Sequence, residues 1–271
     1  MPSISFLNHL GALLTLWLLL CCGAPAAENG RILMVTEATF PPYEFRDGNT
    51  ILGIDPEIMR EVARRTGREL VIEDMSFDSV ITAVVSGKAD VAASGITVTP
   101  ERRRKVDFSI PYVEAAQVII VPKGSPIRKR EDIRGKRIGV QHGATGDIYV
   151  TRNIQQPERF PNGALAVAAG KVDAAVIDQD PAKMYVAGNE RLEILPEPLT
   201  SESYAIAVRK GDTVLLQDIN DTIAALKASG KLEEIRNAYA AMQVKSAAGP
   251  EQHASGGGWL ENTWLDLKES F

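Results

Sequence analysis

The residues best suited to chemistry lie at positions 94–103, which read SGITVTPERR. Thr99 and Pro100 predict a helix start there, because threonine caps a helix and proline fits its first turn. The first turn of a helix presents unpaired backbone N–H groups that attract anions. Arg102 stands in that turn, and its guanidinium can hold a carboxylate through two parallel hydrogen bonds. The stretch therefore suggests a binding site for a small carboxylate. Taken by itself, however, it fits a capped surface helix with solvated basic residues even better.

An internal repeat suggests a partner for this binding site. Residues 83–93 (AVVSGKADVAA) and 166–176 (AVAAGKVDAAV) share one pattern of helix end, glycine stop and strand. By this correspondence Gly95 and Asp178 follow the carboxyl ends of two equivalent strands. Ligands of open α/β sheets bind at such ends. If the two copies lie in lobes that face each other, Arg102 and Asp178 approach one cleft from opposite sides.

A second helix start follows the predicted strand at residues 137–140. The sequence there, QHGATG at 141–146, turns through a glycine into a helical pattern. Its exposed backbone N–H groups would give an anion a second place to bind.

The elements that must position these residues alternate between strand and helix patterns, which predicts an α/β fold. Residues 117–121 (QVIIV) and 204–208 (YAIAV) are apolar strand segments, each followed by a basic residue and glycine. They bracket an insert, so we expect a continuous second lobe inside a discontinuous first lobe, with these segments as the hinge. The expected first lobe comprises residues 28–121 and 210–244, and the second comprises residues 122–209.

The first residues have the pattern of a secretory signal. An apolar run at 10–22 precedes APA at 24–26, whose small residues fit a cleavage site. We expect residues 1–26 to be a signal peptide and the mature chain to be periplasmic or extracellular. An uncleaved membrane anchor is the alternative, but the run is short for a bilayer. Both cysteines, Cys21 and Cys22, lie in this segment, so the mature chain would offer no thiolate ligand or cysteine nucleophile.

Composition narrows the function further. The formal net charge of −5 argues against nucleic-acid binding, which usually needs a basic face. His9 and His253 lie in the expected signal peptide and linker, so His142 is a better candidate for the edge of a pocket than for a metal ligand. We therefore expect no metal and no cofactor.

The end of the chain differs in character from the rest. Residues 245–258 are rich in alanine, serine and glycine, which predicts a flexible linker. Residues 259–271 place Leu260, Trp264, Leu267 and Phe271 on one apolar helix face. This tail is either a frayed terminus or a helix that contacts a membrane or a partner.

Five ordered motifs resemble family 3 of the bacterial extracellular solute-binding proteins, the amino-acid receptors of ABC importers. They are PPYEF at 41–45, LGIDPEI at 52–58, SGKADVAASGITVTPERRRKVDFSIPY at 86–112, EDIRGKRIGVQHGATG at 131–146 and VDAAVID at 172–178. The resemblance covers residues 31–243. It implies a two-lobed type II periplasmic binding protein, each lobe a mixed sheet flanked by helices, which closes on its ligand and delivers it to a permease.

The resemblance also implies roles for individual residues. Arg102 would take the α-carboxylate of an amino acid, helped by the Thr97 hydroxyl and by backbone N–H groups near Thr145. Asp178 would accept the α-ammonium group together with the Gly95 carbonyl. Such pairing offsets the cost of burying a zwitterion. Phe40 and Phe77 would enclose the ligand side chain, and the remaining expected lining residues are Ser94, Ile96, Gln141 and Ala144.

Glu37 is the expected specificity residue. In the resembling family an acidic residue here accompanies cationic or amide ligands, so we expect arginine, lysine, histidine or glutamine. A carboxylate at the floor of the pocket would favour these over apolar or acidic amino acids. The alternative is a strand-end glutamate that faces solvent.

Two other functions remain open. A cyclohexadienyl-dehydratase-like enzyme shares this scaffold, and Glu37 and His142 are the only extra acid–base candidates, so we expect no catalysis. The chain could also be the ligand-sensing domain of a larger membrane protein, such as a fused permease or sensor, which the tail after residue 245 favours.

Overall fold

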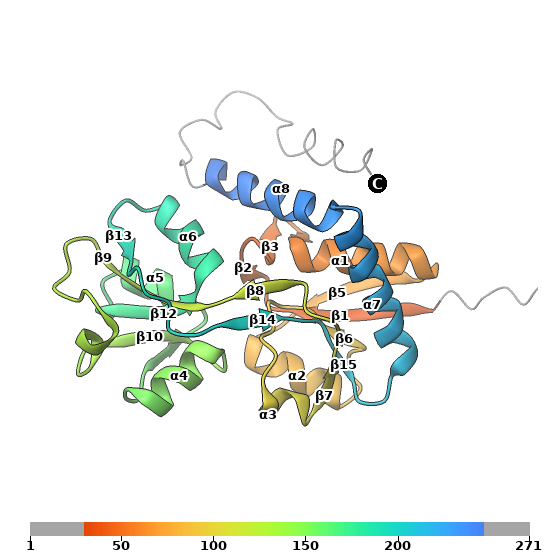
Figure 1. Cartoon of the computed structure of the whole chain (residues 1–271), viewed down its shortest axis with the longest axis horizontal. Coiled ribbons are helices and arrows are strands. Elements are labelled where there is room, and N and C mark those ends of the chain that lie inside the picture. Colours follow the sequence, from red (N-terminus) through yellow and green to blue (C-terminus); the bar gives the residue numbers. More distant parts are fainter. Residues whose placement is uncertain (1–29, 247–271) are drawn as a thin grey trace, which may run out of the picture.

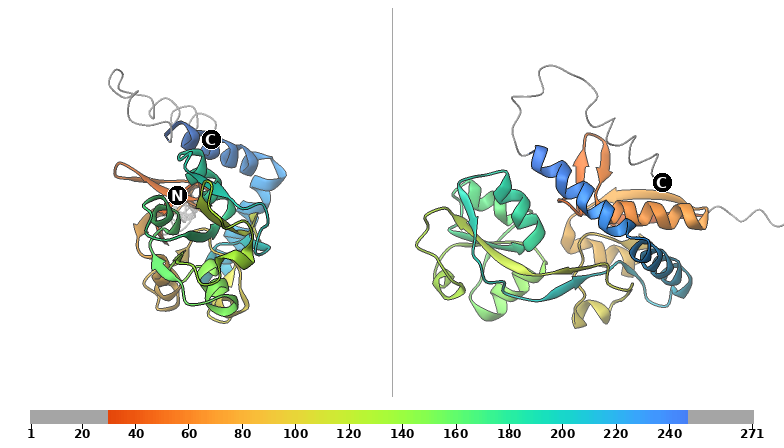
Figure 2. Two further views of the ribbon diagram at one scale, coloured as in Figure 1. Left: turned by 90° about the vertical axis from the view of Figure 1, so that its left-hand side faces the viewer. Right: turned by 45° about the horizontal axis from the view of Figure 1, so that its top comes forward.

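The computed structural model describes residues 30–246 as two lobes joined by a pair of strands (Figures 1 and 2). The expected signal peptide and the expected tail lie outside the described residues. So does the expected linker, apart from residues 245 and 246, which continue the last helix. Among the described helices, none combines the length and the apolar composition that a bilayer crossing needs.

The first lobe is built on a five-stranded mixed sheet with the strand order β5-β1-β6-β15-β7. Strand β1 is parallel to β5 and β6, whereas β15 is antiparallel to β6 and β7. A small antiparallel sheet of β2, β3 and β4 lies beside it. The strands are β1 (Arg31–Thr36), β2 (Thr39–Phe40), β3 (Glu44–Asp47), β4 (Thr50–Leu52), β5 (Glu69–Asp74), β6 (Val91–Ala92), β7 (Val106–Phe108) and β15 (Ala207–Arg209). The helices are α1 (Ile54–Thr66), α2 (Phe77–Val85), α3 (Pro100–Arg103), α7 (Thr213–Ala228) and α8 (Lys231–Ser246).

Both faces of this sheet are covered. Because side chains alternate along a strand, Ile32 and Met34 of β1 pack in the cluster that includes residues of α1 and α7, while Val35 packs toward α2. The carboxyl end of β6 is therefore held between two helical layers, and the chain leaves it as the 94–103 segment.

The second lobe repeats this plan with the strand order β11-β10-β12-β9-β13. Helix α4 packs on one face of the sheet, and α5 and α6 pack on the other. The strands are β9 (Gln117–Pro122), β10 (Ile138–Gln141), β11 (Glu158–Phe160), β12 (Ala174–Asp178) and β13 (Leu192–Ile194). The helices are η1 (Arg130–Ile133), α4 (Thr145–Asn153), α5 (Gly163–Ala168) and α6 (Gln179–Ala187).

The crossing between the lobes differs from the expected one. Strand β9 belongs to the second sheet and β15 to the first, so most of the segments at 117–121 and 204–208 lies within or next to these sheets, and only Tyr204 belongs to a connecting strand. The lobes are joined by β8 (Val113–Ala115) and β14 (Glu202–Tyr204), which pair antiparallel between them (Figure 1). The apolar segments were wrongly expected to cross between the lobes. Their apolar character instead reflects burial, because a strand that is covered on both faces is the most apolar kind. We therefore propose junctions at β8 and β14 in place of residues 121 and 209.

Candidate ligand-binding site

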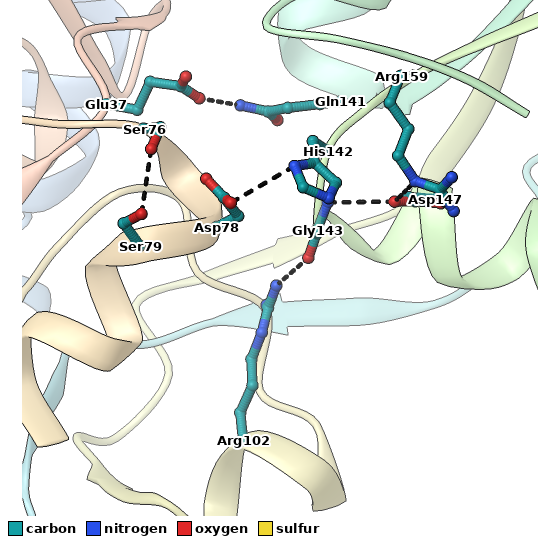
Figure 3. Close-up of polar contacts among 10 residues, drawn as sticks. All are labelled: Glu37, Ser76, Asp78, Ser79, Arg102, Gln141, His142, Gly143, Asp147 and Arg159. Atoms are coloured by element: carbon teal, nitrogen blue, oxygen red, sulfur yellow. Dashed lines mark hydrogen bonds and ion pairs between the residues drawn. The ribbon is translucent and has the colours of Figure 1, made fainter.

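Arg102 lies between the lobes and contacts both of them (Figure 3). Its backbone N–H donates to Thr99 Oγ1 at 3.1 Å, the contact of a threonine cap. Its Nη1 donates to the carbonyl of Thr97 at 2.8 Å, and its Nη2 donates to the carbonyl of Gly143 in the second lobe at 3.1 Å. The guanidinium carbon lies 5.3 Å from the ring centroid of Phe77. A guanidinium has five N–H donors, so these two carbonyl contacts leave donors for a ligand carboxylate.

Asp178 provides the opposite charge from the end of β12. The residue is only 5% exposed, and its carboxyl group accepts a hydrogen bond from the hydroxyl of Tyr204. Burial raises the pKa of Asp178 to about 6, although the Tyr204 and Gln117 hydrogen bonds and the charge of Arg102 oppose this rise. Burial lowers the pKa of Arg102, and the charge of Asp178 opposes that change. The charge of each group therefore shifts the pKa of the other.

Glu37 follows β1 and reaches across to the second lobe. Its carboxylate accepts a hydrogen bond from Gln141 Nε2 (Figure 3). The residue is 8% exposed, and burial raises the pKa of its carboxyl group, with the Gln141 hydrogen bond acting in the opposite sense. The alternative of a solvent-facing glutamate is therefore wrong.

Phe40 packs directly on the loop that follows β6. Gly95 has a φ of +51°, and a Cβ added to it would lie 2.8 Å from Phe40 Cε1. A side chain at position 95 would displace the ring. The Phe40 ring also stacks on Tyr43 at a centroid distance of 6.0 Å, so it is fixed from two sides.

Two buried acids fix the backbone of this loop from behind. Ser94 Oγ donates to Glu44 Oε1 at 3.0 Å, and the Gly95 N–H donates to Asp55 Oδ2 at 2.9 Å. Burial raises the pKa of Asp55 to about 7 and raises that of Glu44 well above its ordinary value, with repulsion from Asp55 adding to the latter. Sequence reasoning quoted the motifs that contain both residues but assigned them no role.

The remaining expected residues fall into different environments. Gln141 and Ala144 are buried beside the site, and Thr145 begins α4. The side chain of Ile96 is fully buried in the apolar cluster that includes residues of α2, so we propose that any contact of this residue with a ligand is through its backbone. His142 is exposed, and its Nδ1 lies 3.4 Å from Asp78 Oδ2 in the first lobe (Figure 3).

Glu202 of β14 is a site residue that sequence reasoning missed. One of its carboxylate oxygens accepts hydrogen bonds from Thr97 Oγ1 and from Thr145 Oγ1, both at 2.8 Å. It lies in a short polar segment, SES, with no periodic pattern to mark it.

Further contacts join the lobes around the site. Tyr43 donates to Asp180 Oδ2 at 2.8 Å, and Tyr185 donates to the carbonyl of Thr39 at 3.1 Å. These contacts hold the two lobes against each other. A separate cavity of about 340 Å³ opens between α6 and α8 and is lined by none of the expected ligand-binding residues.

The arrangement suits the binding of a small zwitterion, because it offers groups of both charges. The first lobe supplies the positive charge of the partly buried Arg102, and the second supplies the carboxyl group of the buried Asp178. Among residues 30–246 no cluster of three or more histidine, cysteine, aspartate or glutamate side chains is arranged to hold a metal ion.

Comparisons with known proteins find relatives over most of the chain. The family model described as bacterial extracellular solute-binding proteins, family 3, matches residues 32–242. The arginine-binding extracellular protein ArtP of Bacillus subtilis is 31% identical over 235 residues, which cover 82% of this chain and 92% of that protein. A probable histidine-binding protein of Neisseria gonorrhoeae is 33% identical over 238 residues, which cover 83% of this chain and 89% of that protein.

Solved structures share the fold. Holo ArgBP from T. maritima matches with a TM-score of 0.70 and 44% identity, covering 73% of this chain and 91% of that chain. The substrate-binding protein AbpA from Streptococcus pneumoniae, bound to L-arginine, matches with a TM-score of 0.74 and 30% identity, covering 82% of this chain and 97% of that chain.

Proposed function

Because this chain belongs to family 3 of the bacterial extracellular solute-binding proteins, we propose that it is the amino-acid-binding receptor of an ABC importer. It would capture an amino acid between its lobes and deliver it to the permease. Relatives named for binding arginine or histidine support an amino-acid ligand. Delivery across a cell envelope requires the receptor outside the membrane, so we propose that residues 1–26 direct secretion and are removed.

The observation that carries the proposal is that the charges of Arg102 in the first lobe and Asp178 in the second influence each other at the place where the lobes meet. The α-carboxylate of the ligand would lie on the remaining Arg102 donors, and the α-ammonium group on Asp178 and the Gly95 carbonyl. Each ligand charge would then offset the burial of an opposite protein charge.

The ligand side chain would extend toward Glu37. This buried carboxylate and its partner Gln141 favour arginine, lysine, histidine or glutamine, because such side chains donate hydrogen bonds or carry positive charge. Phe40 would pack along the apolar part of the ligand side chain.

Binding without catalysis is part of the proposal. Glu37 is held by Gln141, and His142 lies exposed at the rim, so neither expected acid–base candidate is free inside the site. Turnover of a cyclohexadienyl acid by the purified protein would contradict this and favour the enzymatic alternative.

The test is a thermal-shift screen of residues 27–271 against the proteinogenic amino acids. A ligand that binds only the native state raises the melting temperature, by an amount that grows with its concentration over Kd. We expect one or more of the four favoured amino acids to raise it, and aspartate and leucine to leave it unchanged. If none of the amino acids shifts the transition, the proposed function fails.

A further inference from the structure

Glu202 contacts hydroxyl groups from both lobes with one carboxylate. Its Oε2 accepts from Thr97 Oγ1 in the first lobe and from Thr145 Oγ1 in the second, each at 2.8 Å. Its Oε1 accepts from Thr200 Oγ1 at 2.8 Å. The residue lies on β14, one of the two strands that join the lobes, so it is well placed to serve both halves of the site.

The direction of these hydrogen bonds is fixed by chemistry. An ionised carboxylate can only accept, and a threonine hydroxyl has a single proton. That proton points at Glu202 in both Thr97 and Thr145, so toward a ligand each hydroxyl oxygen can only accept. Thr145 Oγ1 also accepts from Gln117 Nε2 at 3.0 Å, which leaves it little further capacity.

The negative charge of Glu202 also favours an ammonium group over a carboxylate at the Thr97 hydroxyl. This charge raises the pKa of Arg102 and the pKa of Asp178, so it acts on both ends of the site. A ligand carboxylate placed on the Thr97 hydroxyl would face a like charge across one oxygen, which is unfavourable. A ligand ammonium group there would face an opposite charge.

We infer that Glu202 is a positioning residue of the amino-acid site, which orients the Thr97 hydroxyl as an acceptor for the α-ammonium group of the ligand. The inference rests on the proposed function and deepens it. It replaces the expectation that the Thr97 hydroxyl helps to bind the α-carboxylate. That carboxylate is left to Arg102 and to the backbone N–H groups at the start of α4.

The test compares two ligands that differ only at the α-ammonium group. Titration calorimetry would measure L-arginine and its desamino analogue, 5-guanidinopentanoate, with the wild type and with Glu202→Gln. The glutamine side chain offers one acceptor and one donor, so the hydroxyl protons must rearrange. We expect the variant to bind arginine about tenfold more weakly, as for a lost charge-assisted hydrogen bond, and to bind the analogue within about twofold of the wild type.

A double-mutant cycle separates orientation from structural damage. In Thr97→Val there is no hydroxyl to orient, so adding Glu202→Gln should change arginine affinity by less than about twofold. A similar tenfold loss in both backgrounds, or an equal loss for both ligands, would overturn the inference. If Glu202→Gln does not fold, Thr97→Val alone decides: its preference for arginine over the analogue should fall about tenfold, and an unchanged preference would overturn the inference.

The outcomes also distinguish this inference from the proposed function. A wild-type protein that binds no amino acid would refute both. A wild type that binds arginine, with a Glu202→Gln variant that binds it equally well, would refute the role of Glu202 alone.

Discussion

At the scale of single residues, the guanidinium of Arg102 connects the two lobes. Arg102 donates to a carbonyl of each lobe, but carbonyl oxygens carry only partial charge. Burial lowers its pKa, yet an arginine stays protonated in proteins. Among residues 30–246 its hydrogen-bond partners are these uncharged carbonyl groups, so a ligand carboxylate would add the full opposite charge. The affinity of the site should therefore depend strongly on this one side chain.

The Arg102→Ala variant should lose at least about 30-fold in amino-acid affinity, because a desolvated ligand carboxylate would be left unpaired. Titration calorimetry measures this. The matched control is Arg103→Ala, since Arg103 is exposed, lies on the same short helix and packs instead near Phe108. Equal affinities for Arg102→Ala and the control would contradict the assignment.

The buried carboxyl group of Asp178 should lower the stability of the ligand-free protein, although it is expected to bind the ligand. Its pKa is about 6 in the folded chain and near 3.8 when unfolded, so between these values the native state binds the extra proton. Stability from this group is thus greatest in acid and is lost as the pH rises through about 6. Asp178→Asn has no charge to bury, so the ligand-free variant should be more stable at pH 7.5, by on the order of 1–3 kcal/mol.

Denaturant titrations of the ligand-free proteins check this expectation. The difference between Asp178→Asn and wild type should close near pH 4, where the native carboxyl group is already neutral. A difference that is the same at both pH values would show that the ionisation of Asp178 is not its cause. At neutral pH the variant should bind amino acids poorly, because it cannot offset the α-ammonium charge.

At the scale of elements, the site depends on where strands end. The loop after β6 and the loop after β10 each leave a buried strand, and α3 and α4 begin just beyond them. Buried partners fix the first loop from behind through Ser94 and Gly95. The rigidity of these loops should therefore matter as much as the side chains they carry.

Gly95→Ala tests that rigidity. It adds backbone strain at a φ of +51° and a Cβ 2.8 Å from the Phe40 ring, so we expect a stability loss of about 2–4 kcal/mol and weaker ligand binding. The control is Gly48→Ala, which has a φ of +56° but nothing within 4 Å of the added Cβ. It should lose only about 1 kcal/mol and keep its affinity. Similar effects of the two substitutions in thermal unfolding and calorimetry would count against the packing argument.

The sequence predicted the parts of the fold that follow from local rules. The Thr99 cap starts α3 because one hydroxyl contacting one N–H is a matter of adjacent residues. The two-lobed α/β architecture followed from the motifs and the repeated pattern. The roles of the individual ligand-binding residues remain predictions.

Local rules could not predict features that depend on contacts between residues far apart in the sequence. The apolar segments at 117–121 and 204–208 were expected to be the hinge, but apolarity reports burial, and the strands that cross between the lobes are more polar. Ile96 was expected at the ligand because of its position in a motif, yet its side chain turns into the core. Glu202 gave no signal, because its partners lie far away in sequence.

At the scale of the whole molecule, contacts between the lobes set the balance between closed and open forms. Tyr43 and Tyr185 each donate a hydrogen bond across the lobes, and His142 faces Asp78. These contacts lie outside the expected ligand contacts. We therefore expect them to favour closure whether or not a ligand is bound, and to contribute to the apparent affinity.

Tyr43→Phe removes one such hydrogen bond and keeps the ring. We expect about fivefold weaker amino-acid binding, from a loss of about 1 kcal/mol, and a larger radius of gyration for the ligand-free protein in small-angle X-ray scattering. Tyr149→Phe is the control, because the Tyr149 hydroxyl pairs with Arg130 inside the second lobe. If both variants behave alike, the Tyr43 contact does not influence closure.

The anchoring of Glu37 has a consequence for how such a receptor could change over generations. The backbone N–H of Glu37 donates to Ser94 Oγ at 3.0 Å, and this bond is indifferent to the side chain at position 37. If Glu37 sets specificity as proposed, a mutation there should alter which nutrient is recognised while the main chain keeps its course. The position is thus a natural starting point for diverging duplicate genes and for engineered biosensors.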